Sequence, residues 1–449
     1  MPCGQEFLMP LLSRKIKQQE PSQKQAEQKS KSPASTFKGP EKTAIEKLIA
    51  LAQKKHAEDA VVDLFKALAQ YAFSLRASDI HLEPWEEHAK VRLRIDGILH
   101  DDFEIPIDIH IQLMARLKIL TAMRTDEHHA PQDGRFKFDA GEESVDVRAS
   151  VIPTTLGEKA VLRLLSSQSH KLTLEQLGLS EGDLARVWRA IKKPWGMILA
   201  TGPTGSGKTT TIYAILEILN KREVNISTIE DPVEFEIDGV NQSQVDSVAK
   251  LTFATGLRSL LRQDPDVLMV GEIRDQETAK IAVNAAMTGH TLLSTLHTND
   301  SATTIPRLID MGVETFLVAS TLNVAIAQRL VRRVCPDCMS SKTLSKKEAE
   351  KILYPTALAT LFGKNASIQV AEAKGCAKCK ETGYRGRVGL YEVLENTEAI
   401  QKLIINRASS SDIKDAARAE GMTTIETDAA RKITAQETTL DEFIRVMQE

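Results

Sequence analysis

The feature that most constrains this chain is an eight-residue segment, Gly202–Thr209, with the sequence GPTGSGKT. It matches the pattern G-x-x-x-x-G-K-[ST], lies after a short apolar run (Gly196–Ala200) and precedes a helix-forming run (Thr210–Leu216). In this strand–loop–helix context, glycines let backbone N–H groups point inward at phosphates, and the helix N-terminus adds partial positive charge. The alternative is a glycine-rich turn that binds no ligand. Such a turn would not require an apolar strand before it and a helix after it. The predicted phosphate-binding residues are Gly202, Pro203, Thr204, Gly205, Ser206, Gly207, Lys208, Thr209 and Thr210.

The two residues that end this loop predict the ligand. Lys208 is expected to reach the β- and γ-phosphates, and the hydroxyl of Thr209 is expected to hold Mg²⁺. The sequence therefore predicts bound ATP with Mg²⁺, but a phosphate loop alone does not predict hydrolysis.

Acidic residues at the ends of two apolar runs supply what hydrolysis requires, a carboxylate that orients water beside the γ-phosphate. Glu272 follows the apolar strand DVLMVG and is the candidate for polarising the attacking water, with a solvated strand-end acid as the alternative. Glu230 and Asp231 close another strand and could hold Mg²⁺ or its waters. Glu272 is expected where a parallel sheet opens its ligand crevice.

The chain changes character along its 449 residues, which allow for about three domains. Residues 13–43 are rich in Gln, Lys, Ser and Pro, and we expect a disordered basic tether with a short apolar patch over residues 1–43. Its apolar patch, Phe7–Leu12, is either a frayed terminus or a docking peptide. Residues 44–168 combine helical periodicity with alternating strands and predict an α+β domain. We expect a linker with one helix over 169–193, and alternating strands and helices of a parallel sheet over 194–449.

Four of the five cysteines form two C-x-x-C hooks that are 37 residues apart. Two such hooks can place four thiolates around one tetrahedral ion, and a closed four-sulfur site is structural because it leaves no position for water. We expect Zn²⁺ in a lobe at about 334–390 with helices of its own. Redox disulfides or an iron–sulfur cluster are the alternatives, and Cys3 is expected to be a free thiol. The predicted ligands are Cys335, Cys338, Cys376 and Cys379.

Net charge and hydropathy limit the partners and the cellular location that the sequence predicts. The formal net charge is −3 and aromatic residues make up 4% of the chain, so neither predicts nucleic acid as the main partner. Basic residues beside the cysteines could touch nucleic acid, but we expect a solvated or partner-facing surface: Arg329, Arg332, Arg333, Arg385 and Arg387. We find no long apolar run or secretory signal, and a cytoplasmic location is expected.

From about Ala77 onward, the chain resembles the secretion ATPases of type II secretion and type IV pilus systems (the GspE/PilB group). The resemblance rests on GPTGSGKTTT, IEDPVEF, LRQDPDVLMVGEIRDQETA and TGHTLLSTLHTND, and on ASDIHLEP, LRIDGIL, PQDGRF, VDVRAS and GEKAVLRLL before them. It implies an α/β fold with a RecA-like P-loop ATPase domain, preceded by a smaller α+β (PAS-like) domain, with a C-terminal zinc-binding lobe. It also implies a homo-hexamer that acts on an inner-membrane platform and recruitment proteins.

The same resemblance implies roles for individual residues. Glu230, Asp231 and Glu234 correspond to the aspartate-rich box of the family, and Glu272 corresponds to its catalytic glutamate. His290 and His297 correspond to its histidine box, with His297 the expected γ-phosphate sensor. Chemistry alone would make both histidines structural.

Arginines of the N-terminal domain are expected to reach the phosphates, in the manner of an arginine finger. The matching residues are Arg148 and Arg163, with Arg135 a weaker candidate, and a surface salt bridge is the alternative for each. The expected catalytic residues are thus Glu272, His297, Glu230, Arg148 and Arg163.

Three departures from the family pattern matter. Only the tether and the apolar patch stand where members usually carry a further N-terminal docking domain. Leu156 and Lys159 replace residues that are often His and Arg, and Lys159 keeps the charge without the planar fork. The cysteines match the assembly-type members and are a feature that the retraction members lack.

We expect an ATP-hydrolysing motor that lifts pilin or pseudopilin subunits into a filament. A nucleic-acid motor and a non-enzymatic scaffold remain as rival functions. DNA-stimulated turnover would favour the first rival, whereas the joint presence of Lys208, Glu272 and His297 argues against the second.

Overall fold

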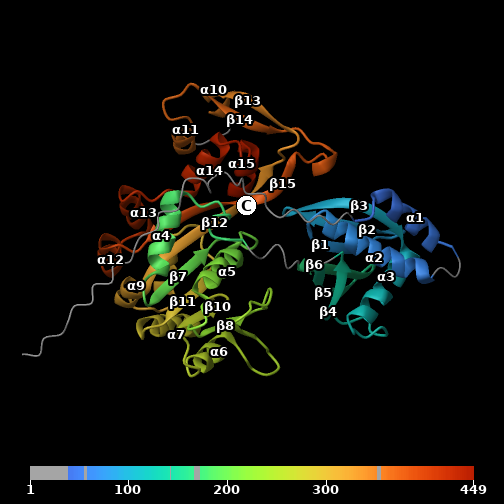
Figure 1. Cartoon of the computed structure of the whole chain (residues 1–449), viewed down its shortest axis with the longest axis horizontal. Helices are drawn as coiled ribbons and strands as arrows, with labels where there is room; N and C mark the ends of the chain where they lie inside the picture. Colours follow the sequence, from blue (N-terminus) through green and yellow to red (C-terminus); the bar gives the residue numbers. More distant parts are fainter. Residues whose placement is uncertain (1–38, 55–57, 142, 166–171, 351–354, 449) are drawn as a thin grey trace, which may run out of the picture. The chain divides into compact units, whose positions relative to one another are not determined.

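A computed structural model describes residues 39–448, apart from residues 55–57, 142, 166–171 and 351–354 (Figure 1). The predicted apolar patch and most of the predicted tether lie outside the described residues. Helix α1 (Lys42–Ala52) takes up the last two residues of that predicted tether. Within the described residues, every helix is too short or too polar to cross a membrane.

The N-terminal part is a six-stranded sheet with three helices. Each neighbouring pair of strands runs antiparallel, in the order β3-β2-β1-β6-β5-β4. The strands follow the alternation in the sequence, since buried and more exposed residues alternate along most of β5. The elements are α2 (Glu58–Ser74), β1 (Ala77–Pro84), β2 (His88–Ile95), β3 (Ile98–Pro106), α3 (Ile107–Leu120), β4 (Gln132–Ala140), β5 (Glu143–Thr154) and β6 (Gly157–Leu165).

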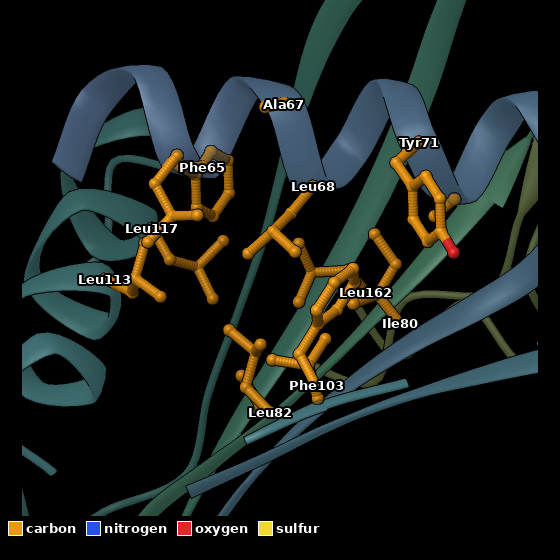
Figure 2. Packing of buried hydrophobic residues seen from close by; sticks show 14 of the residues in the cluster. Phe65, Ala67, Leu68, Tyr71, Ile80, Leu82, Phe103, Leu113, Leu117 and Leu162 are labelled. Carbon is orange, nitrogen blue, oxygen red and sulfur yellow. The ribbon is translucent and has the colours of Figure 1, made fainter. Parts of the chain in front are cut away.

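One face of this sheet is covered by apolar side chains from α2 and α3 (Figure 2). Phe65 and Leu68 of α2 lie toward Leu113 and Leu117 of α3, and Leu82 of β1 lies beneath them. Burying each such side chain stabilises the fold by about 2 kcal/mol. The α+β composition predicted for this part is confirmed, whereas its likeness to a PAS domain stays a prediction.

The C-terminal part is built on a seven-stranded sheet in the order β15-β12-β7-β11-β10-β8-β9. All neighbouring strands from β12 to β9 are parallel, as the alternation of strand and helix predicted. The strands are β7 (Gly196–Thr201), β8 (Ile226–Glu230), β9 (Asn241–Gln244), β10 (Val267–Val270), β11 (Thr291–Leu296), β12 (Leu322–Val334) and β15 (Tyr384–Glu395).

Strand β15 departs from the expected parallel sheet because it runs antiparallel to β12. The chain leaves the sheet after Val334, forms the cysteine-bearing lobe, and returns to the same edge at Tyr384. A return without a crossover gives an antiparallel pair. The lobe contains β13 (Met339–Ser345), α10 (Lys346–Ala349), α11 (Pro355–Phe362), β14 (Ser367–Ala373) and the 3₁₀-helix η2 (Ala377–Cys379).

Helices surround this sheet, and their sequences carry clear start signals. Ser180 caps α4, Asp275 caps α7 and Ser409 caps α13, each by accepting a hydrogen bond from a backbone N–H in the first turn. The helices are α4 (Glu181–Ile191), α5 (Lys208–Leu219), α6 (Phe253–Leu260), α7 (Gln276–Met287), α8 (Thr304–Asp310), α9 (Thr315–Thr321), α12 (Glu398–Ile405), α13 (Ser410–Ala419), α14 (Ile425–Thr434) and α15 (Leu440–Gln448).

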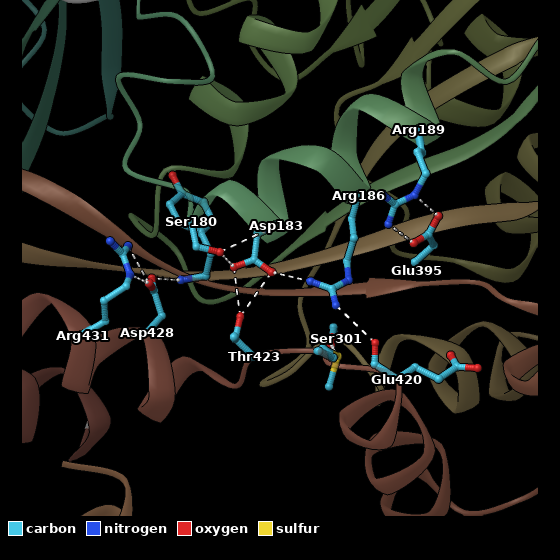
Figure 3. A network of polar contacts seen from close by, with 12 residues as sticks. Ser180, Asp183, Arg186, Arg189, Ser301, Glu395, Glu420, Thr423, Asp428 and Arg431 are labelled. Atoms are coloured by element: carbon cyan, nitrogen blue, oxygen red, sulfur yellow. Dashed lines mark hydrogen bonds and ion pairs between the residues drawn. The ribbon is translucent and has the colours of Figure 1, made fainter. Parts of the chain in front are cut away.

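A polar network fixes α4 to the rest of the C-terminal part (Figure 3). The buried carboxylate of Asp183 accepts hydrogen bonds from Ser180 (2.6 Å), Thr423 (2.9 Å) and Arg186 (3.3 Å). Burial raises the pKa of Asp183, and these three partners oppose the rise. Arg189 adds a two-pronged pair with Glu395 at 2.6 and 2.9 Å. The helix predicted within the linker is therefore anchored to the C-terminal part.

Candidate functional site

Four neighbouring parallel strands bring the predicted residues to one edge of the sheet. The order β7-β11-β10-β8 places the carboxyl ends of these strands side by side (Figure 1). The phosphate loop follows β7, His297 follows β11, Glu272 lies two residues after β10, and Glu230 ends β8. Ligands of open α/β sheets bind outside the carboxyl ends of their strands, so this edge is the candidate site.

The phosphate loop leads directly into helix α5. Gly207 has a φ of 88°, a left-handed conformation that glycine adopts without strain, and the helix begins at Lys208. The Lys208 ammonium folds over its own loop and donates to the carbonyl oxygens of Gly202 and Pro203, each at 3.0 Å. Burial lowers the pKa of Lys208, and the nearby charge of Glu272 opposes this shift. The loop thus has a positive charge at the mouth of a helix N-terminus, as phosphate binding requires.

Glu272 and His297 lie within contact distance of each other. Nε2 of His297 is 3.3 Å from one carboxylate oxygen of Glu272, and Arg274 is 2.5 Å from the other. The Glu272 side chain is only 12% exposed, so these two neighbours hold a largely desolvated carboxylate. His290 does not join them, because its Nδ1 lies 2.9 Å from the carbonyl oxygen of Ala285 at the end of α7.

A threonine pair connects the phosphate loop with the segment that carries His297. Thr201, the last residue of β7, hydrogen-bonds to the side chain of Thr298 and accepts from the Thr298 backbone N–H at 3.0 Å. Thr298 also donates to the carbonyl oxygen of Asp300 at 3.0 Å. Sequence reasoning missed these threonines, which hold the two loops of the site together.

Glu230 lies inside the protein, where neutral groups occupy both of its carboxylate oxygens. Tyr213 donates to one oxygen, and Thr228 (2.6 Å) and Gln242 (3.2 Å) donate to the other. Burial, and then the charge of Glu230, raise the pKa of Tyr213. In this structure Glu230 is thus engaged by α5, β8 and β9, and a direct role in catalysis stays a prediction.

The three predicted arginines form a row across the outer face of the N-terminal sheet. Arg148 of β5 is the cross-strand partner of Arg135 on β4 and of Arg163 on β6. Asp79 of β1 is the next residue in this row and pairs with Arg163 at 3.0 Å. Arg148 also donates to the carbonyl oxygen of Val233 and lies 3.7 Å from Glu234. The three arginines thus lie next to one another on neighbouring strands. Their contact with a nucleotide stays a prediction.

The two cysteine hooks meet at one point of the lobe. The sulfur atoms of Cys335, Cys338, Cys376 and Cys379 all lie within 4.8 Å of one another, and the four cysteines are free of disulfides. Three of the sulfur–sulfur distances are 4.0, 3.7 and 3.7 Å. A tetrahedral zinc site with Zn–S bonds of about 2.3 Å requires sulfurs about 3.8 Å apart, so the cluster fits this ion.

Two arginines that were expected on a solvated surface are used inside the C-terminal part. Arg329 donates to the carbonyl oxygen of Asn299, close to His297. Arg332 pairs with the buried Glu442 at 2.8 Å and lies over the ring of Tyr384. Burial alone would raise the pKa of Glu442, but hydrogen bonds from Arg445 and Arg332 bring it down to about 2. That prediction was therefore wrong for Arg332, whereas for the half-buried Arg329 it stays a prediction.

The comparisons with known proteins agree with this geometry. The family described as type II/IV secretion system protein matches residues 54–445. The chain is 45% identical over 392 residues to the type IV pilus assembly ATPase PilB of Myxococcus xanthus, covering 87% of this chain and 68% of that protein. It is 44% identical over 390 residues to a type II secretion system protein E of Pseudomonas aeruginosa, covering 87% and 76%.

Solved structures show a similar fold. The pilus retraction motor PilT, solved with ADP, is 27% identical with a TM-score of 0.58, covering 85% of this chain and 96% of that one. The ATPase DotB of Legionella pneumophila is 21% identical with a TM-score of 0.61, covering 85% and 94%. The second likeness concerns the fold alone.

Proposed function

This chain belongs to the type II/IV secretion system protein family, and from that premise we propose an ATP-driven motor for filament assembly. ATP hydrolysis would power assembly of a pilus or pseudopilus, and with it type IV pilus extension or protein secretion, through an inner-membrane platform. Relatives named as pilus assembly ATPases and type II secretion proteins, each more than 40% identical, support this function.

The nucleotide site that we propose is the carboxyl edge of β7, β11 and β10. The observation that carries it is the meeting of three groups there: the Lys208 loop, the Glu272 carboxylate and the His297 imidazole. The ADP in the structure of PilT supports a nucleotide in the same fold. Lys208 and the loop N–H groups would hold the phosphates, and the Thr209 hydroxyl would hold Mg²⁺, which neutralises phosphate charge.

Hydrolysis would use residues on both sides of the γ-phosphate. Glu272 would orient the attacking water, and His297 would hold the Glu272 carboxylate and sense the phosphate. Arg148 and Arg163 would approach from the N-terminal domain, residues 44–168, to stabilise charge that builds up on the phosphate. Turnover would then depend on closure of that domain onto the ATPase domain, residues 194–449.

The four cysteines would hold a structural Zn²⁺ in the lobe at about 334–390. Their sulfur–sulfur spacing supports this ion, and backbone N–H groups of Cys376 and Gly383 lie 3.1 and 3.2 Å from the sulfur of Cys379. Backbone N–H groups that donate to the sulfur stabilise a thiolate ligand. The ion would tie the start of the lobe to its end and would take no part in hydrolysis.

The partners that we propose follow from the family. The chain would work in the cytoplasm as a homo-hexamer, peripheral to the inner membrane through the platform and recruitment proteins of its system. The tether with its apolar patch is our candidate for recruitment. No direct contact with nucleic acid is expected, and stimulation of turnover by DNA at moderate salt would overturn that expectation.

Lys208→Ala tests the nucleotide site. We expect the dissociation constant for a fluorescent ADP analogue to rise about 100-fold, because the variant removes the charge that faces the phosphates. Lys221→Ala is the matched control, since this exposed lysine lies just beyond the far end of α5. Unchanged binding by Lys208→Ala would show that the nucleotide binds elsewhere.

A further inference from the structure

A buried glutamine lies directly behind the phosphate loop. Strand β12 pairs with β7 up to Ala327 opposite Thr201, so Gln328 lies one residue beyond the end of β7, where the loop begins. Its side chain is almost wholly buried, with 1% of the residue exposed. A buried amide must be hydrogen-bonded to offset the loss of water, so its partners show what it holds.

Both ends of the Gln328 amide are occupied by the phosphate-loop segment. Its Nε2 donates to the carbonyl oxygen of Ser206 at 2.7 Å, and its Oε1 accepts from the hydroxyl of Thr211 at 2.7 Å. The orientation of the amide is fixed by chemistry, because a carbonyl oxygen can only accept and must face the NH₂ group. Gln328 therefore joins the last turn of the loop to the first turn of helix α5.

The bond to Ser206 bears on phosphate binding through the planarity of the peptide group. In a trans peptide, the carbonyl of Ser206 and the N–H of Gly207 point in opposite directions. Because Gln328 holds the carbonyl on its own side, the Gly207 N–H is turned to the other side of the loop. Backbone N–H groups that point into the loop are what binds phosphate.

Close packing leaves the loop little freedom on the Gln328 side. A Cβ added at Gly202 would lie 2.5 Å from the Gln328 carbonyl oxygen, and one at Gly207 would lie 3.0 Å from its Nε2. The two glycines therefore permit the approach of β12 as well as the turn itself. Gln328 thus packs against the loop on the side from which β12 approaches.

We propose that Gln328 is a positioning residue for the nucleotide site, which presets the phosphate loop by holding the Ser206 carbonyl. The proposal rests on the nucleotide site proposed above. According to this proposal, losing the Gln328 amide weakens nucleotide binding in addition to lowering the stability of the fold. A residue that only fills the core would lower stability and leave affinity unchanged.

Two variants of Gln328 and one of Thr211 separate these roles. Gln328→Met keeps the length of the side chain but cannot donate, and Gln328→Glu still accepts from Thr211 but places a second oxygen against the Ser206 carbonyl. Thr211→Val is the matched control, since it has the same shape and loses the bond on the Oε1 side, together with a contact of the hydroxyl with Tyr391. The full-length protein is used, and binding of Mg–ADP, KM for ATP, kcat and thermal stability are measured.

We expect both Gln328 variants to weaken Mg–ADP binding and raise KM by about tenfold or more, with a much smaller change in kcat. Thr211→Val should lower the melting temperature about as much as the Gln328 variants do. Its affinity for Mg–ADP should change less than about threefold. Affinity of Gln328→Glu should also recover at lower pH, because a protonated carboxyl can donate to Ser206 again.

Two results would overturn the proposal: normal Mg–ADP affinity in the Gln328 variants, or an equal loss in Thr211→Val. Lys208→Ala distinguishes these failures from failure of the site itself. If Lys208→Ala loses binding while the Gln328 variants keep it, the nucleotide site stands and only the role of Gln328 is wrong.

Discussion

At the scale of single residues, the contacts of Glu272 determine what it can do. Its carboxylate lies between His297 and Arg274, and it is close enough to Lys208 to oppose the lowering of that lysine's pKa. Arg274 and His297 thus contact the two oxygens of this carboxylate, and Lys208 lies close to it. A charged carboxylate beside the phosphate loop is suited to orient water or accept its proton.

Glu272→Gln should separate hydrolysis from binding. The amide keeps the size of the side chain but removes its charge and basicity, so we expect kcat to fall by about 100-fold or more. Affinity for ATP should stay within a few-fold, since Lys208 and the loop are unchanged. Steady-state turnover and nucleotide binding check this expectation.

The control for that variant is Glu277→Gln, which removes an exposed acid of α7 whose pair with Arg258 is at the surface. Exposed pairs contribute little, so its turnover should match that of the unchanged protein. Normal turnover in Glu272→Gln would mean that another group orients the water.

The sequence predicted those site residues whose chemistry shows in a local motif. Lys208, Thr209 and Glu272 stand in fixed spacing to an apolar strand, and the structure places the loop and Glu272 at one edge of the sheet. Gln328 and Tyr213 were missed because each is a common neutral residue within an apolar segment. Their roles depend on strand register, which no short stretch of sequence specifies.

At the scale of elements, the cysteine lobe is a part whose stability we expect to depend on a single site. Its two-stranded sheet, β13 with β14, is small, and an isolated pair of strands is marginal in water. The four cysteines lie where the lobe leaves β12 and returns to β15. A zinc ion bound there would close the loop between the two strands.

Cys376→Ser should remove the metal and loosen the lobe. We expect about one zinc ion per chain in the unchanged protein and a small fraction of that in the variant, because three thiolates hold zinc far less tightly. Metal content is measured by mass spectrometry, and protease sensitivity between 339 and 373 reports the stability of the lobe.

Cys3→Ser is the control, since Cys3 belongs to neither C-x-x-C hook of the sequence, and the zinc content of this variant should be unchanged. Equal zinc in Cys376→Ser, or none in the unchanged protein purified without chelators, would contradict the zinc assignment.

The elements also show what a sequence pattern could and could not predict. Alternating strand and helix signals predicted the parallel core correctly, because each β–loop–helix unit is a local pattern. The direction of β15 was not predicted, since it depends on where the lobe returns to the sheet. The row of arginines was likewise not predicted. Arg148 is 13 residues from Arg135 and 15 from Arg163, and the three meet only through strand register.

At the scale of the whole molecule, the row of arginines is electrostatically unfavourable, and a phosphate-binding function would explain its presence. Like charges on neighbouring strands repel, and the Asp79 carboxylate at the end of the row is shared between Arg163 and Arg94 of β2. Burial lowers the pKa of Arg148, Glu234 opposes this shift, and the charges of Arg135 and Arg163 add to the lowering. A phosphate that accepts hydrogen bonds from these guanidinium groups would relieve the repulsion. The relief would be greatest in the transition state, where negative charge builds up on the phosphate.

Arg148→Ala and Arg163→Ala should therefore lower turnover more than affinity. We expect kcat to fall about 100-fold or more in each variant, as for an arginine finger, while Mg–ADP affinity changes only a few-fold. Arg148→Lys should restore little, since the ammonium lacks the planar fork. Arg124→Ala is the matched control, because this exposed arginine pairs only with its neighbour Asp126 in the N-terminal part. Full turnover in both variants would show that hydrolysis does not depend on the N-terminal sheet, and closure of that domain would then need another role.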